Sequence, residues 1–88
     1  MDAWEDTFAT AIGEDPVTPE ELGIVLRLSR DVAHRVERKL APVSAYLAGV
    51  HAGRLAATGG GARAEGLRAA ERAARAILPE AELGDEGA

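Results

Sequence analysis

The segment spanning residues 22–40 constrains the fold more than any other part of the chain. Its apolar or small residues recur at three- and four-residue spacing over about five turns: Leu22, Val25, Leu26, Ser29, Val32, Ala33, Val36 and Leu40. This period predicts an amphipathic helix whose apolar stripe faces a core. Immediately before it, Thr18 can cap a helix, Pro19 suits the first helical position, and Glu21 stands three residues after the cap. We therefore predict one long helix from residue 19 to about residue 40.

Three more helices are predicted from the residues that interrupt the chain. Gly13 ends an early helix, Pro42 separates the second helix from the third, and Pro79 stops the last one. The stretch "TGGGA" at residues 58–62 breaks the chain once more. The predicted helices cover about residues 2–12, 19–40, 42–58 and 63–78.

Two of these helices carry patterns that predict how they pack. The first has Trp4, Phe8 and Ile12 at a spacing of four, which makes one apolar stripe. The third has a row of small residues, which lets a neighbouring helix approach closely. That row contains Ala45, Gly49, Ala52, Gly53 and Ala56.

The composition favours helices over strands. Nineteen of the 88 residues are alanine, which has the highest helix propensity, whereas Thr, Tyr, Phe and Trp, which favour strands, are scarce. We predict an all-α fold, a small bundle of about four helices with short connections. Residues 1–78 are expected to form a single helical domain, and residues 79–88 an acidic flexible tail.

The sequence argues against a secreted protein, a membrane protein and a protein held by disulfides or thiolate metal sites. The chain has no cysteine, which excludes disulfides and thiolate metal sites and fits a reducing compartment. Its first residues are acidic and precede no apolar run, so they do not read as a signal peptide. No apolar run reaches the ~18 residues that a membrane span needs. We expect a cytoplasmic protein that does not enter the membrane.

The charges are distributed unevenly along the chain. The net charge is −5, yet residues 1–21 and 79–88 contain eleven acids and no base, and residues 22–78 contain all ten bases and four acids. An acidic ligand or partner could therefore bind the middle of the chain. The alternative is that the acidic ends fold back over the basic middle and cancel its field.

The candidate site is a charged row on the second helix, on the side opposite its apolar stripe. It consists of Arg27, Arg30, Asp31, His34, Glu37 and Arg38. Arginines and a histidine beside an acid can hold a phosphate or a carboxylate, and the forked guanidinium group of arginine suits such oxyanions. Alternating charges on an outer helix face are also typical of a solvated surface with ion pairs inside the helix. Both interpretations remain open at this stage.

We predict no catalytic residue, metal site, cofactor or enzyme activity. His34 and His51 lie on different outward flanks, so they do not converge as metal ligands. The glycine-rich stretch follows a helix and precedes no lysine, unlike phosphate-binding loops, which follow a strand. Nucleic-acid binding is not expected, because the net charge is negative and the three aromatic residues are dispersed.

The stretch "LSRDVAHRVERKLAPVSAYLAGVHAGR" at residues 28–54 resembles a small family found in high-GC bacteria, the domain of unknown function DUF6457. The pattern is R-D-V-A-H-x-V-E-R, then Ala-Pro, then L-A-G-x-x-A-G-R. It falls here on Arg30, Asp31, Val32, Ala33, His34, Val36, Glu37, Arg38, Ala41, Pro42, Leu47, Ala48, Gly49, Ala52, Gly53 and Arg54. The helix that contains Trp4 also fits, whereas the glycine-rich linker, the last helix and the acidic tail do not belong to this pattern.

The resemblance implies a role beside an enzyme. Similar domains occur alone or fused to the C-terminus of enzymes that resemble molybdopterin guanylyltransferase (MobA-like enzymes). It therefore implies an accessory domain in the biosynthesis of the molybdenum cofactor, molybdopterin guanine dinucleotide. The expected partner is a molybdenum-cofactor nucleotidyltransferase or a molybdoenzyme maturation factor. Two alternatives stay open, namely a small-anion module that binds a nucleotide or pterin phosphate, and a purely structural homodimer whose paired helices hide the charged row.

Overall fold

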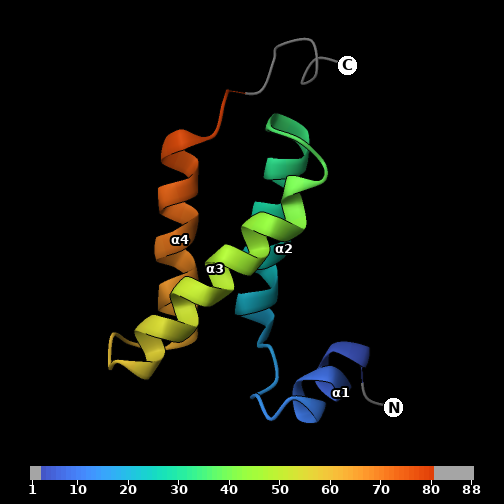
Figure 1. The fold of residues 1–88 in the computed structure, drawn as a ribbon, viewed down its shortest axis with the longest axis vertical. Coiled ribbons are helices and arrows are strands. Elements are labelled where there is room, and N and C mark those ends of the chain that lie inside the picture. The colour runs from blue at the N-terminus through green and yellow to red at the C-terminus, as the bar shows by residue number, and fades with distance from the viewer. Residues whose placement is uncertain (1–2, 81–88) are drawn as a thin grey trace.

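A computed structural model describes residues 3–80 of the chain, and these residues form four α-helices without a strand (Figure 1). The helices are α1 (Trp4–Ala11), α2 (Pro19–Arg35), α3 (Leu40–Ala57) and α4 (Arg63–Ile77). The predicted all-α class is confirmed. Most of the predicted acidic tail, from residue 81 onward, lies outside the described residues. None of the described helices is long and apolar enough to cross a membrane.

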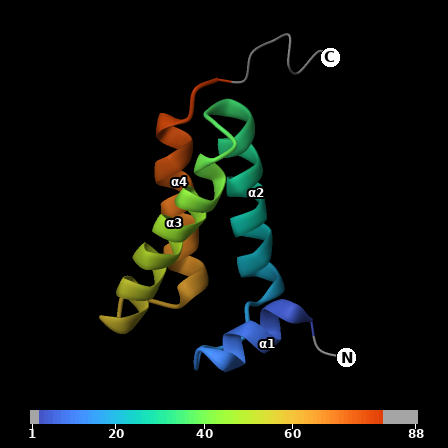
Figure 2. The same ribbon diagram turned by 45° about the vertical axis from the view of Figure 1, so that its right-hand side comes forward.

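Helices α2, α3 and α4 contact one another and form a bundle. Figure 1 shows α2 and α4 running in the same direction, with α3 crossing them in the opposite direction. Helix α1 packs against none of the other three within the described residues. Figures 1 and 2 both show it apart from the bundle, below the N-terminal end of α2. The fold is therefore a three-helix bundle with one additional helix.

The bundle core is small. It consists of Ile24, Leu28 and Val32 from α2, Ala48 and Ala52 from α3, and Leu67 from α4. Alanine contributes little buried area, but it brings the helix backbones close together. The approach is closest at Gly66, where an added Cβ would lie 2.6 Å from the Cα of Ala52.

The predicted close approach of α3 to a neighbour is thus confirmed at one position of its row of small residues. Ala52 contacts α4, whereas Gly49 and Gly53 have nothing within 4 Å of an added Cβ. The partner residue Gly66 lies on α4 and was not part of the predicted row.

The start of α2 is as predicted. Thr18 is the N-cap, Pro19 occupies the first turn, and the side chains and backbones of Thr18 and Glu21 form a reciprocal capping box. The backbone N–H of Thr18 donates to Glu21 Oε1 at 2.8 Å, and that of Glu21 donates to Thr18 Oγ1 at 3.1 Å. The box satisfies donors that a helix start otherwise leaves unpaired.

The predicted end of α2 near residue 40 is wrong. The helix ends at Arg35, Val36 is its C-cap, and Leu40 already begins α3. Pro42 stands in the first turn of α3, where its missing N–H breaks no helical hydrogen bond. Because α3 can therefore begin ahead of the proline, the reversal of direction falls on residues 36–39.

The predicted centre of the buried face of α2 is also wrong, by about a quarter turn of the helix, although Val32 is buried as predicted. Leu22 and Val36 were expected inside but are 37% and 49% exposed. The buried residues of α2 are Glu21, Ile24, Leu28, Asp31 and Val32. Two of these five are acids, and both form ion pairs with arginines of α4. Ile24, Leu28 and Val32 recur at a spacing of four, and pairing of the two acids with α4 favours this row over the predicted one.

Candidate functional site

The predicted charged row divides in the structure, and part of it holds the bundle together. Arg27 on α2 forms a two-pronged contact with Glu71 on α4, through Nε to Oε2 at 2.8 Å and Nη2 to Oε1 at 3.0 Å. Parallel forked contacts of this kind are the strongest arginine–carboxylate geometry. The prediction that Arg27 faces away from the rest of the chain was therefore wrong.

Asp31 is buried and lies one turn further along the same interface. Nη2 of Arg75 lies 2.8 Å from Asp31 Oδ2 and 3.0 Å from Glu71 Oε2, so this arginine joins both acids. Arg30 reaches Asp31 Oδ1 at 3.3 Å from the exposed side. The intrahelical pair between Glu71 and Arg75, four residues apart, is a stabilising spacing. These five residues form what we call the ionic network of α2 and α4.

Opposite charges lower the pKa of both acids in this network. For Glu71, the hydrogen bond from Arg27 is the largest influence and lowers the pKa, burial raises it, and Arg75 lowers it further. For Asp31, burial is the largest influence and raises the pKa, but Arg75 and Arg30 together outweigh it. The pKa of each acid is consequently below its ordinary value, and both carboxylates are ionised at neutral pH.

A second ionic contact fixes the start of α2 to the start of α4. Arg63 donates from Nε and Nη2 to the two carboxylate oxygens of Glu21 at 2.9 and 3.0 Å. The same guanidinium group donates to the backbone carbonyls of Asp15 and Pro16 at 3.3 and 2.9 Å. Burial raises the pKa of Glu21, but the Thr18 backbone and Arg63 lower it by more. Arg63 thereby holds the connection between α1 and α2 in place.

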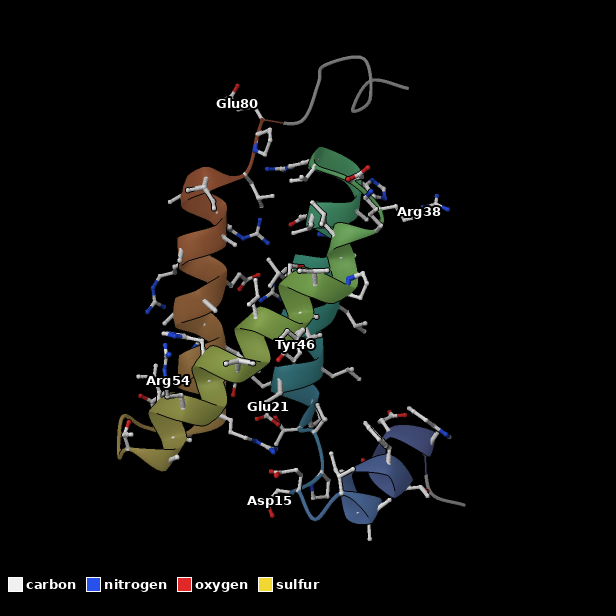
Figure 3. All side chains as sticks on the ribbon, in the orientation of Figure 1. Asp15, Glu21, Arg38, Tyr46, Arg54 and Glu80 are labelled. Carbon is white, nitrogen blue, oxygen red and sulfur yellow. The ribbon has the colours of Figure 1, made fainter. Side chains whose placement is uncertain are left out.

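The other three predicted residues are exposed and lie apart from this network. His34 is on the exposed side of α2, and Glu37 and Arg38 lie in the turn after it. Glu37 Oε1 lies 3.7 Å from Lys39 Nζ. The side chain of Arg38 points away from the bundle (Figure 3). In residues 3–80 no group of three or more potential ligands is placed to hold a metal ion. The six predicted residues therefore do not converge on one site.

An apolar groove lies between the C-terminal half of α4 and the junction of α2 and α3. Its volume is about 670 Å³. On the α2 and α3 side it is lined by Leu28, Val32, Val36, Val43 and Leu47, and on the α4 side by Ala69, Ala70, Ala73, Ala74 and Ile77. Ser44 and His51 are the polar residues of its lining in the described part of the chain. We call this feature the apolar groove.

The chain has more large apolar residues than its small core buries, and several of them line the groove. Val36, Val43, Leu47 and Ile77 are large and apolar, yet each is between 45% and 84% exposed. The core does not bury them, because the α4 wall opposite Val36, Val43 and Leu47 consists mostly of alanine. An apolar surplus of this kind indicates a surface that another molecule covers.

The fold and the groove define a small all-α domain, and the six predicted site residues do not converge within the part of the chain that the structure describes. A family model described as "Domain of unknown function (DUF6457)" matches residues 1–85. The chain therefore belongs to this family. The match extends over the glycine-rich linker and α4, so our expectation that these parts lie outside the family pattern was wrong. No curated protein and no solved structure matched the chain.

Proposed function

We propose that this chain is a non-catalytic helical domain that binds another protein in the cytoplasm, as an accessory to molybdenum-cofactor biosynthesis. The observation that carries the protein-binding role is the apolar groove. Its walls present aliphatic side chains from three helices and few polar groups, which suits the apolar face of a helix from another protein. The cofactor pathway rests on the resemblance of the chain to domains fused with MobA-like enzymes.

The ionic network supports a binding role without catalysis. Its acids and arginines are satisfied by one another, and no buried side-chain N or O atom in residues 3–80 lacks a hydrogen-bond partner. A catalytic group needs a proton or a lone pair that it can use on a substrate. Groups committed to bundle packing do not meet this need.

The proposed partner is a molybdenum-cofactor nucleotidyltransferase or a molybdoenzyme maturation factor. The test is binding between the purified chain and a molybdopterin guanylyltransferase, measured by calorimetry. The informative variant is Leu47→Asp, because Leu47 lines the groove and is 59% exposed. The matched control is Tyr46→Asp, because Tyr46 precedes it, is 69% exposed and does not line the groove.

We expect the wild-type chain and Tyr46→Asp to bind the enzyme, and Leu47→Asp to lose at least tenfold in affinity, since a charge would enter an apolar contact. Both substitutions are at exposed positions, so the bundle should fold in either variant. Equal binding by both variants would exclude the groove as the contact surface. Failure of the wild-type chain to bind nucleotidyltransferases and maturation factors alike would remove the cofactor-pathway role.

A small-anion module remains the second candidate, favoured by the exposure of His34 and Arg38. Of the four predicted donors, Arg27 and Arg30 already contact carboxylates, which leaves His34 and Arg38 for a nucleotide or pterin phosphate. Such a site predicts a rise in melting temperature with millimolar GTP that disappears in Arg38→Ala. Absence of any shift in the wild-type protein would dispose of it.

A further inference from the structure

We propose that the apolar groove takes helix α1 of a second copy of this chain, and that two copies exchange their α1 helices reciprocally. This inference rests on the proposed function in one respect, since it treats the same groove as a protein-binding surface. It names an occupant for that groove from within the chain itself. A partner enzyme would then compete with α1 for the groove.

Helix α1 has an apolar stripe that its own chain leaves about half exposed or more. Trp4, Phe8 and Ile12 are 74%, 49% and 57% exposed, and the rings of Trp4 and Phe8 stack with centroids 5.3 Å apart. An isolated helix of eight residues is marginal in water. A helix of this length that keeps its stripe exposed gains stability from any apolar groove that accepts it.

The same chain holds its own α1 away from its groove. Arg63 binds the carbonyls of Asp15 and Pro16 at the start of α4, whereas the groove runs along the second half of that helix. Fourteen residues separate Arg63 from Ile77, which is about 21 Å along a helix axis. Figures 1 and 2 both show α1 at the end of the bundle opposite the C-terminal end of α4.

Charge does not oppose the entry of α1 into the groove. Glu5 and Asp6 lie in the first turn of α1, and its last turn contains no base. The lining of the groove contains no acid within the described residues. The acids of α1 would therefore meet no like charge among the lining residues.

The area that can be buried favours a reciprocal exchange over a one-sided contact. Each aromatic residue of the stripe carries ~150–250 Å² of surface, of which roughly half to three quarters is exposed here. With Ile12, one stripe offers on the order of 300 Å², and the groove that receives it exposes less than that. One such contact stays well below the ~1,200 Å² of a stable interface, and a second contact brings the buried area close to that size. A two-fold exchange makes both contacts at once.

Trp4 is the single tryptophan of the chain, so its fluorescence reports the environment of α1 without interference. The test is to measure the molecular mass by sedimentation and the Trp4 emission maximum over the same range of concentrations of the full chain. We expect monomers with red-shifted emission to convert to dimers with blue-shifted emission at one common midpoint.

Variants on both sides of the contact sharpen the test. Ala73→Asp places a charge in the groove at an exposed residue, and Ala76→Asp is its control on the same helix, exposed but outside the lining. Phe8→Asp changes the stripe on α1, which does not contact the bundle helices. We expect Ala73→Asp and Phe8→Asp to raise the midpoint concentration at least tenfold, and Ala76→Asp to leave it within twofold. Circular dichroism shows that each variant remains helical.

Three outcomes would overturn the proposal. The first is a monomer with red-shifted emission at all concentrations, and the second is a dimer in which the emission of Trp4 stays red-shifted. The third is a blue shift that does not depend on concentration and that Ala73→Asp abolishes. This third outcome would mean that α1 folds onto the groove of its own chain. The experiment contains no partner enzyme, so a chain that dimerises through α1 yet binds no nucleotidyltransferase keeps this inference and loses the proposed function. A chain that stays monomeric and binds the enzyme through Leu47 would keep the proposed function and lose this inference.

Discussion

Helices α1 and α2 both present apolar residues at helical spacing, yet only α2 is covered by neighbouring helices. Leu28 on α2 is 2% exposed, whereas Phe8 on α1 is 49% exposed. The difference lies in the surroundings, because α2 faces both α3 and α4 and α1 faces neither. A helical period therefore indicates which residues can be buried together, and the presence of a partner surface decides whether they are.

The largest expected effect distinguishes these two helices directly. Leu28→Ala should lower the free energy of unfolding by about 2–5 kcal/mol, because it removes a large side chain from the core and leaves a cavity. Phe8→Ala, measured at a concentration where the chain is monomeric, should change it by less than about 0.5 kcal/mol. Urea titrations followed by circular dichroism measure both. A loss at Phe8 as large as that at Leu28 would show that α1 packs on the bundle.

The contact of α3 with α4 gives the next largest effect. Gly66→Ala should destabilise the bundle by about 1–3 kcal/mol, because the new Cβ would lie 2.6 Å from a backbone atom of Ala52 and the helices must separate. The matched control, Gly53→Ala, should change the stability in the opposite direction. Gly53→Ala meets nothing within 4 Å and should stabilise α3 by about 0.5–1 kcal/mol, since alanine favours helices. Thermal unfolding of both variants measures the difference in their stability. Equal effects of the two variants would show that α3 and α4 lie further apart than described.

The ionic network should contribute less to the free energy of unfolding than Leu28 or the close contact at Gly66. Glu71→Ala removes the carboxylate that Arg27 and Arg75 share, and we expect a loss of about 1–2 kcal/mol, because both arginines are partly exposed and recover water. Glu65→Ala is the control, an exposed acid on the same helix that forms no ion pair in residues 3–80. Urea titrations at low and high salt should show the difference between the two variants shrinking as salt rises. A difference that does not depend on salt would assign the loss to packing.

The mildest perturbation is a change in pH. The pKa values of Glu21, Asp31 and Glu71 are lowered by folding, so the unfolded chain binds protons first as the pH falls. Their stabilisation is complete above the unfolded values of 4.5 for glutamate and 3.8 for aspartate, and it is lost as the pH falls below them. We expect stability to be constant between pH 5.5 and 7, within about 0.5 kcal/mol from these acids, and to decline below pH 4.5. The double variant Asp31→Asn and Glu71→Gln should decline less steeply.

The sequence predicted the helices and the capping box because these depend on local interactions. Thr18, Pro19 and Glu21 are neighbours in the chain, and the glycine-rich turn needs no distant partner. The period alone could not decide which apolar row of α2 is buried, because burial of Glu21 and Asp31 beside that row depends on arginines more than forty residues away. The prediction of the candidate site failed for the same reason. Arg27 and Asp31 look free to bind a ligand in the sequence, because their ion-pair partners on α4 are distant in the chain.

The ionic network also has a consequence for the topology of the bundle. Arg27 pairs with Glu71 and Asp31 pairs with Arg75, and each pair spans 44 residues. A hairpin of α3 and α4 offers two sides on which α2 could pack, which give mirror-related arrangements of three helices with similar apolar contacts. The acids and bases of the two helices pair across the interface in the observed arrangement, whereas the other arrangement would leave each acid with only the arginine of its own helix. The network thus favours the observed handedness of the bundle.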